Sequence, residues 1–351
     1  MDKKSYGKYI GKKWLYVLIL AALLIAAALI SLSVGSSGIS LSQILKALVG
    51  AGEPTSRTII WNVRMPRIAT AMAVGIALAL AGCVMQNVLR NPLASASTLG
   101  VSQGASFGAA FAIICLSAGT QISTSSAATI TLTNPYLVVV CAFLGGITTT
   151  LVILLLSRIS GATPSVMILA GVALSSIFSG ATVLLQYFSD DNKVASVVYW
   201  TFGNLGRAGW KEIALILALS AGAFVYFYLN RWNYNCMESG TNTAKSLGVN
   251  VDLLILVSMC VCTLISATAI AFVGTISFVG LISPHIVRRF VGNDYRFLIP
   301  GSALMGAVIM LASDIASRAI TPPAILPIGA LTSFLGAPLF LYMIVKKGNI
   351  K

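Results

Sequence analysis

Charged residues are scarce in this sequence, and their scarcity excludes a soluble protein. Only 9% of the 351 residues are Asp, Glu, Lys or Arg, whereas 57% are hydrophobic. About a quarter of the residues in a soluble globular domain are charged, so this chain cannot cover a water-facing surface of its own size. Disorder is excluded as well, because disordered segments combine low hydrophobicity with high charge.

The sequence also lacks the motifs of several enzyme classes. It has no GxxxxGK[ST] phosphate loop and no HExxH, and we expect neither an ATP site of that kind nor a hydrolytic set of residues. A single histidine and six cysteines without a CxxC pair offer little for a metal site or a disulfide framework. We therefore expect no catalytic residue, no metal site and no cofactor.

Ionisable residues are almost absent from the long apolar runs. Asp314 and His285 lie near the ends of predicted helices, and we assign no chemistry to His285. Proton-coupled carriers use ionisable residues inside the membrane as relays, and secondary transporters are built from inverted repeats around a midplane site. Neither feature is found. A secondary transporter and a membrane enzyme are therefore the weaker alternatives, and we expect energy to come from a partner.

What the sequence has in abundance is long hydrophobic runs. Its mean hydropathy is +0.92, and several runs approach or exceed the roughly 20 residues that span a bilayer as a helix. We predict an all-α polytopic membrane protein forming a single transmembrane domain over residues 1–351, with about ten transmembrane helices. These helices are placed near residues 14–34, 65–89, 99–118, 136–157, 165–188, 211–229, 253–273, 277–292, 299–317 and 326–345.

The formal net charge of +14 comes from positive residues whose distribution along the chain indicates a membrane topology. Five lysines precede the first apolar run and three follow the last, and cytoplasmic flanks of membrane helices are enriched in Lys and Arg. We therefore place both termini in the cytoplasm, with residues 1–13 as a basic tail, and nucleic-acid binding is disfavoured. Three external arginines, Arg64, Arg67 and Arg318, lie at the outer ends of helices, where positive charge is unusual.

Five short motifs interrupt the apolar background. Their Gly, Pro and polar residues lie at or near the predicted helix ends. In chain order the motifs are Trp61–Arg67 (WNVRMPR), Gln86–Ala105 (beginning QNVLRNPLA), Ala244–Val249 (AKSLGV), Gly274–Arg288 (GTISFVGLISPHIVR) and Asp314–Phe340 (containing DIASR, LPIG and GAPLF).

Together these motifs resemble the FecCD-type permeases, the membrane subunits of ABC importers for ferric siderophores, haem and cobalamin. The resemblance covers about residues 57–345 and implies a type II importer fold like that of the cobalamin importer permease. It also implies a multi-pass protein of the bacterial plasma (inner) membrane. The implied partners are a second permease, identical or paralogous, two cytoplasmic ABC ATPases and an extracytoplasmic binding protein, which is a lipoprotein in a Gram-positive bacterium. We expect a ferric siderophore as substrate, with haem and cobalamin as alternatives.

The resemblance assigns a docking role to Arg64, Arg67 and Arg318, whose family counterparts face acidic residues on the binding protein. Arg64 and Arg67 are three residues apart and therefore share a helix face. Arginine suits such a contact because it forms bidentate pairs with carboxylates. The alternative is that these side chains reach out to lipid headgroups.

Two further sets of site residues are expected at the cytoplasmic side. Residues 230–252 form the cytoplasmic coupling segment, in which we expect a short helix–turn element that fits a groove on the ATPase. Its candidate contacts are Gly240, Ala244, Lys245, Leu247 and Gly248. The resemblance places the gate of the translocation pathway near Asn91, Leu93, Pro164 and Ser165. The chain departs from the family pattern at three positions, where Ala96 replaces a Pro and Thr241 and Ile325 each replace a Glu.

Overall fold

The computed structural model describes residues 3–35, 41–48, 50–51, 53–118, 120–122, 130–132, 134–160, 164–322 and 324–348. Nearly all of these residues are helical, and ten helices match the ten predicted ones, which confirms the predicted all-α fold. They are α1 (Lys3–Ser33), α4 (Met65–Val88), α5 (Val101–Ile114), α6 (Pro135–Ser160), α7 (Pro164–Tyr187), α9 (Trp210–Leu229), α12 (Val251–Val273), α13 (Val279–Val291), α14 (Tyr295–Ala319) and α15 (Ile328–Gly348).

Two of these helices are too short to cross a bilayer alone. Among the described residues, 7 helical segments are long and apolar enough to span a membrane, but α5 has 14 residues and α13 has 13. At 1.5 Å per residue each reaches only about 20 Å of a hydrocarbon core roughly 30 Å thick. Irregular chain precedes both helices, over residues 89–100 and 274–278. Such backbone is tolerated at membrane depth where it is buried or lines a cavity.

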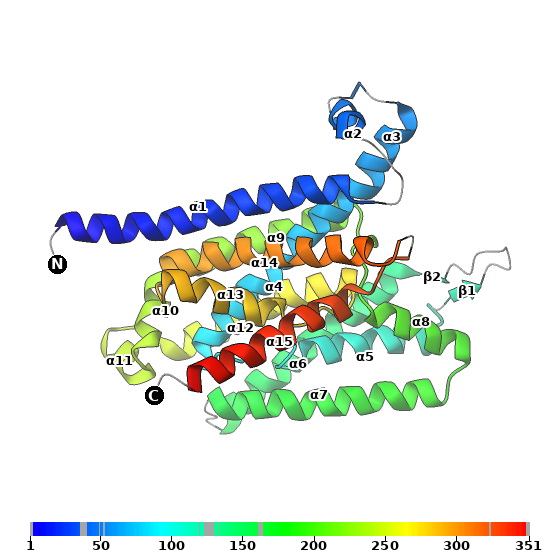
Figure 1. The fold of residues 1–351 in the computed structure, drawn as a ribbon. Coiled ribbons are helices and arrows are strands. Elements are labelled where there is room, and N and C mark those ends of the chain that lie inside the picture. The colour runs from blue at the N-terminus through cyan, green and yellow to red at the C-terminus, as the bar shows by residue number, and fades with distance from the viewer. Residues whose placement is uncertain are drawn as a thin grey trace.

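Smaller elements gather at the two ends of the bundle (Figure 1). We call one the outer end and the other the inner end, in keeping with the predicted topology. The inner end also holds the start of α1 and the end of α15. The outer elements are α2 (Leu41–Leu48), α3 (Pro54–Ile59), the π-helix η1 (Ile60–Arg64), the antiparallel strands β1 (Thr120–Ile122) and β2 (Ile130–Leu132), and α8 (Asp191–Thr201); the inner ones are α10 (Arg231–Glu238) and α11 (Thr241–Ser246).

The first helix is longer than the sequence indicated. It begins at Lys3, so the described part of the basic tail continues α1 instead of preceding it. Lys13 is buried, with its ammonium group 4.4 Å from the ring centroid of Tyr9 and 5.4 Å from that of Phe297. These cation–π contacts let the charge leave water, and the edge-on packing of Trp14 against Phe297 also holds α1 against α14.

Helix α4 is the centre of the bundle, because small residues bring its backbone close to its neighbours. It packs against α9, α12, α13 and α14. A Cβ atom added at Gly75 would lie 2.4 Å from the carbonyl oxygen of Gly306, and one at Gly82 would lie 1.8 Å from that of Gly280. Close approach of this kind drives helix association in lipid, where hydrophobicity does not.

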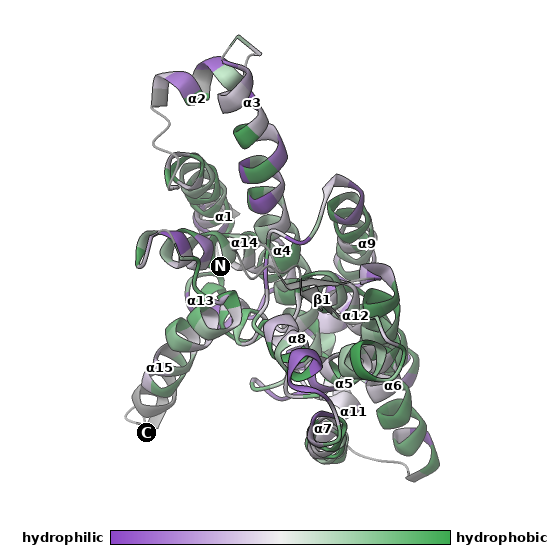
Figure 2. Ribbon diagram, turned by 90° about the vertical axis from the view of Figure 1, so that its right-hand side faces the viewer, coloured by the Kyte–Doolittle hydropathy of each residue, from purple (hydrophilic) through white to green (hydrophobic). Residues whose placement is uncertain are grey.

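Helix α7 stands at the edge of the bundle, and only 6% of its most apolar stretch is buried. Figure 2 shows hydrophobic residues along the long helices and hydrophilic residues concentrated on short elements such as α2 and α8. The apolar faces of helices at the edge of the bundle, such as α7, are therefore suited to contact lipid or a second membrane subunit.

Candidate functional site

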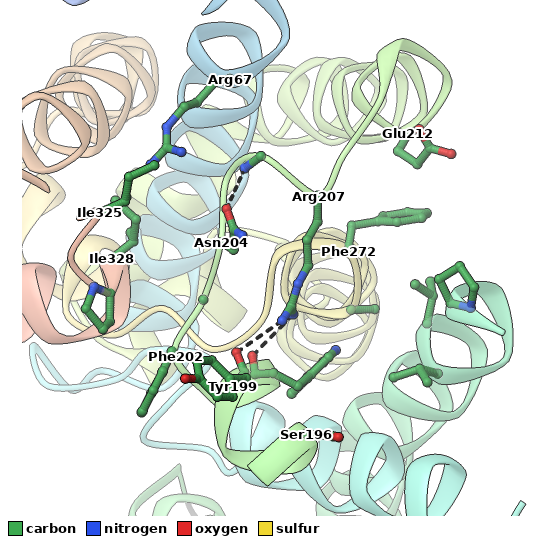
Figure 3. Close-up of a pocket in the computed structure, with 18 of the residues that line it drawn as sticks. Arg67, Ser196, Tyr199, Phe202, Asn204, Arg207, Glu212, Phe272, Ile325 and Ile328 are labelled. Carbon is green, nitrogen blue, oxygen red and sulfur yellow. Dashed lines mark hydrogen bonds between the residues drawn. The ribbon is translucent and has the colours of Figure 1, made fainter. Parts of the chain in front are cut away.

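A cavity of about 940 Å³ opens among the elements of the outer end (Figure 3). Its wall is built from the ends of α4, α6, α8, α9, α12 and α15 and from two irregular linkers, residues 202–209 and 324–327. Much of the lining is apolar. The apolar side chains include Val138, Val139, Phe202, Phe272, Leu326 and Ile328.

Backbone hydrogen bonds tie the linker of residues 202–209 to the end of α12 and to the start of α15. The amide of Asn204 donates to the carbonyl of Val273 (2.7 Å), and the amide of Gly329 donates to that of Phe202 (3.1 Å). Gly274 has a φ of +94°, and a Cβ atom there would lie 2.4 Å from the carbonyl oxygen of Trp200. Only glycine fits both restraints, so the motif Gly274–Arg288 begins where its backbone packs directly against that of α8.

Two charged side chains, Arg207 and Glu212, lie at the rim of the cavity. Arg207 donates to the carbonyl of Tyr199 (3.1 Å), which satisfies the end of α8. Glu212 accepts from the Tyr136 hydroxyl (3.0 Å) and from the amide of Gly209 (2.9 Å). Helices α6, α8 and α9 are thereby tied at the mouth of the cavity.

The three predicted docking arginines lie together at the outer end, with their side chains turned inward. Arg64 and Arg67 are 5% and 8% exposed, and the Arg318 side chain is 10% exposed. Arg67 Nε donates to Asp314 Oδ1 (2.6 Å), and Arg318 Nη2 pairs with Asp314 Oδ2 (2.7 Å). We call these four residues the outer arginine cluster.

The outer arginine cluster also anchors the end of α1. Arg64 donates to the carbonyl of Leu32, while Arg318 donates to the carbonyl and the hydroxyl of Ser31 (3.1 and 2.6 Å). These donors satisfy carbonyl groups that a helix end leaves without partners. Docking by the three arginines stays a prediction, and their burial argues against it. In the sequence, Asp314 is only an ionisable residue near a predicted helix end. No local pattern connects its carboxylate to the three arginines.

At the inner end the predicted helix–turn element is present as α10 and α11. Gly240 and Gly248, with φ of +115° and +84°, flank α11. Leu247 is 64% exposed and Lys245 is exposed, so both are accessible to a partner. Ala244 is fully buried in the chain itself. Ala244 therefore packs α11 onto its own subunit, and its contact with an ATPase stays a prediction.

A polar network beneath this element was not predicted. Glu238, at the end of α10, accepts from the Asn87 amide (3.3 Å), the Tyr295 hydroxyl (3.2 Å) and the Asn293 amide (3.0 Å). The Asn87 amide also donates to the carbonyl of Tyr234 (3.0 Å). The network thus joins α10 to α4 and α14. Its signal in the sequence was the polar pair that opens the motif Gln86–Ala105, at the end of an apolar run.

The predicted gate residues lie in the turn after α4 and at the start of α7. Asn91 accepts from the amide of Leu93 (2.8 Å), which forms a turn within residues 89–100, and Leu93 is 43% exposed. Pro164 is the first residue of α7, a position that proline favours because the amide it lacks would have no partner there. Ser165 follows it and is exposed. Their role in a translocation pathway stays a prediction.

The described residues contain no group of three or more His, Cys, Asp and Glu side chains that could hold a metal ion. The features whose geometry suits the binding of a solute or a partner are the cavity, the outer arginine cluster and the helix–turn element formed by α10 and α11. A solute could enter at one end, and a partner could contact the other.

Comparison with known proteins identifies the family to which this architecture belongs. Residues 23–346 match the family model of the FecCD transport family. The chain is similar to a predicted ABC transporter permease of Methanocaldococcus jannaschii, with 49% identity over 98% of this chain and 97% of the relative. It is 33% identical to the hemin transport system permease of Yersinia pestis and to an Fe(3+)-citrate import system permease of Bacillus subtilis, each over 94% of this chain and, in that order, 96% and 94% of the relative.

A solved structure is similar over the same length. It is an inward-facing conformation of a metal-chelate type ABC transporter, with a TM-score of 0.79 and 30% sequence identity. The match covers 95% of this chain and 99% of the other.

Proposed function

Since the chain belongs to the FecCD transport family and is an ABC importer permease, we propose that it carries a ferric siderophore complex from the outer end of the bundle into the cytoplasm. The observation that carries this proposal is the outer cavity. At about 940 Å³ it lies at the upper end of the range for small-molecule sites, roughly 300–1,000 Å³. Its apolar lining and few polar groups suit a bulky organic chelate.

The proposed assembly has an energy source at the inner end and a delivery partner at the outer end. Two cytoplasmic ATPases contact α11, where Leu247 offers an exposed apolar side chain next to the exposed Gly248. The polar network at Glu238 gives this contact a direct mechanical connection to α4 and α14. A second permease, identical or paralogous, covers the apolar faces of helices at the edge of the bundle in the plasma membrane.

Docking of the binding protein requires exposed charge, which the outer arginine cluster does not offer. Lys46, Arg57 and Lys211 are exposed at the outer end. We assign to them the contacts with acidic residues of the binding protein, because exposed charges steer association and fix its register. Replacing any one of them with Glu should slow association most strongly at low salt, where screening is weakest.

The experiment that tests the function is uptake into liposomes that contain the permease and its ATPases, with the binding protein outside and ATP inside. We expect radiolabelled iron to enter as the siderophore complex only with ATP, and an ionophore to leave the initial rate unchanged. The matched control is an ATPase subunit that binds ATP without hydrolysing it. Uptake that stops with the ionophore and continues without ATP would identify a secondary transporter instead.

Haem is the second candidate substrate. One relative is a hemin transport permease, and haem is also a bulky iron chelate with an apolar body. The same liposomes decide between the two candidates if haem and a ferric siderophore are offered separately with their own binding proteins. Cobalamin serves as the third probe.

A further inference from the structure

Cations and aromatic rings alternate at the inner end, where α1, α10 and α14 come together. The Lys13 ammonium group lies 5.4 Å from the ring centroid of Phe297, and the guanidinium carbon of Arg296 lies 5.4 Å from the same centroid. Arg296 is also 5.0 Å from the Trp232 ring, which Arg231 approaches to 5.9 Å. We call these five residues the inner cation–π series.

Carboxylates do not balance the charge of this series. Asp294 pairs with Arg296 at 2.6 Å, whereas neither Lys13 nor Arg231 forms an ion pair within the described part of the chain. Glu238, which is also on α10, accepts hydrogen bonds from three neutral donors instead. A cation–π contact stabilises a cation without neutralising it. Two positive charges therefore remain for an anion.

Each cation of the series lies where a long helix begins or ends at the inner side. Lys13 directly precedes the apolar run that begins at Trp14. Arg231 comes two residues after the end of α9 at Leu229, and Arg296 lies in the first turn of α14. Lys, Arg and Trp are enriched at this depth of a membrane, close to the lipid phosphates. A phosphate of the cytoplasmic leaflet can therefore reach the series without leaving its level in the bilayer.

The series is accessible from the lipid side of the bundle. The Trp232 side chain is 53% exposed and that of Arg296 is 26% exposed. Helix α1 runs along the edge of the bundle, with Trp14, Leu15 and Leu18 exposed (Figures 1 and 2). Exposed apolar side chains next to unbalanced cations suit a molecule that has both acyl chains and an anionic headgroup. This combination favours a phospholipid over a soluble protein.

We propose that the inner cation–π series binds the phosphate of an anionic phospholipid from the cytoplasmic leaflet. Arg231 donates to this phosphate, because its guanidinium keeps further donors after one is used on the carbonyl of Tyr228 (2.7 Å). Lys13 adds positive charge from α1, and the exposed Trp232 ring lies at headgroup level. One headgroup thereby joins α1 to α10, the first helix of the coupling segment. The inference goes beyond the proposed function, because it does not depend on the cargo.

The test titrates the detergent-purified permease–ATPase complex with phosphatidylglycerol and measures bound lipid by native mass spectrometry. Phosphatidylcholine with the same acyl chains is the matched lipid, because its headgroup has no net charge. We expect phosphatidylglycerol to bind more tightly, and Arg231→Gln to weaken its binding by about fivefold, the effect of one basic residue near an anionic lipid. Arg231→Lys keeps the charge and should lose less. Arg158→Gln is the control variant, since Arg158 is an exposed arginine in the last turn of α6, outside the series.

A second variant keeps the inference falsifiable if Arg231→Gln fails to fold. Trp232→Glu changes an exposed position, leaves both arginines in place and adds a carboxylate beside them, so it should weaken phosphatidylglycerol binding to a similar degree. Equal affinity for the two lipids, no loss in either variant, or an equal loss in Arg158→Gln would overturn the inference.

Two other occupants give different results in the same experiment. Displacement of phosphatidylglycerol by inorganic phosphate alone would show a site for free phosphate and overturn the lipid proposal. Loss of the ATPase subunits from Arg231→Gln at unchanged lipid affinity would overturn it as well and make this surface an ATPase contact. Failure of the proposed function is distinct, because ATP-driven iron uptake would then be absent while the lipid preference remained.

Discussion

At the scale of single residues, Asp314 is the group on which the outer end depends. Its carboxylate is fully buried and pairs with both Arg67 and Arg318. Removing one partner of a buried ion pair leaves the others uncompensated, which costs about 3–5 kcal/mol. We expect Asp314→Asn to lower the thermal unfolding temperature in detergent markedly and to loosen the end of α1.

The matched control for this change is Asp252→Asn. Asp252 pairs with Lys245 at 3.6 Å, and the two side chains are 85% and 55% exposed. An exposed pair of this kind contributes less than about 1 kcal/mol, so its loss should leave the unfolding temperature nearly unchanged. Equal stability of the two variants would show that the outer arginine cluster does not hold α1 in place.

Gly248 is the second residue whose change separates two explanations. Its φ of +84° disfavours any side chain, whereas the space around a Cβ atom is open within this chain. Asn tolerates this conformation better than other non-glycine residues. We therefore expect Gly248→Asn to insert into the membrane and fold, yet to lose ATPase-coupled transport because a partner approaches the backbone there.

Gly292→Asn is the control for Gly248. Gly292 has a φ of +72°, has the same open space and also ends a helix at the inner side, but lies outside the coupling segment. Transport assays in the same liposomes should find this variant active. Normal transport by Gly248→Asn would contradict the proposed contact with the ATPase.

At the scale of elements, close packing of α4 against α14 should be the sensitive point of the bundle. A Cβ atom at Gly75 meets the Gly306 backbone at 2.4 Å, where neither helix can yield without moving. Overpacking of this kind costs about 1–3 kcal/mol. Gly75→Ala should lower thermal stability, whereas Gly180→Ala on the exposed helix α7, where nothing lies within 4 Å, should not. A destabilised Gly180→Ala would show that α7 is packed more tightly than this structure has it.

The elements also show which parts of the fold a sequence can predict. The ten main helices follow from the length and hydropathy of local runs, and the helix–turn at residues 230–252 follows from the polar interruption between two such runs. Helix α8 was missed because its eleven residues carry Asp191, Asn192 and Lys193 at the start and lack the length of a span. The pairing of Arg67 with Asp314 joins residues 247 positions apart, and no local pattern encodes such a contact.

At the scale of the whole molecule, one helix connects the two functional ends. Helix α4 has 24 residues and is therefore about 36 Å long. It holds Arg67 at the cavity and Asn87 in the polar network beneath the coupling element. Helix α4, packed on several sides by other helices, therefore contacts both the cavity and the element beneath the coupling segment.

This arrangement requires the cavity and the coupling element to lie on opposite sides of the membrane, which cysteine labelling can measure. Lys46 in α2 and Lys245 in α11 are both exposed. In a background without the native cysteines, Lys46→Cys should react with a membrane-impermeant maleimide added to intact cells. Lys245→Cys should react only after the membrane is permeabilised, because α11 shares the inner end with the lysine-rich start of α1, and Lys and Arg flanks stay in the cytoplasm. Labelling of Lys245→Cys in intact cells would reverse the orientation and place the cavity on the cytoplasmic side, where an importer could not receive its cargo.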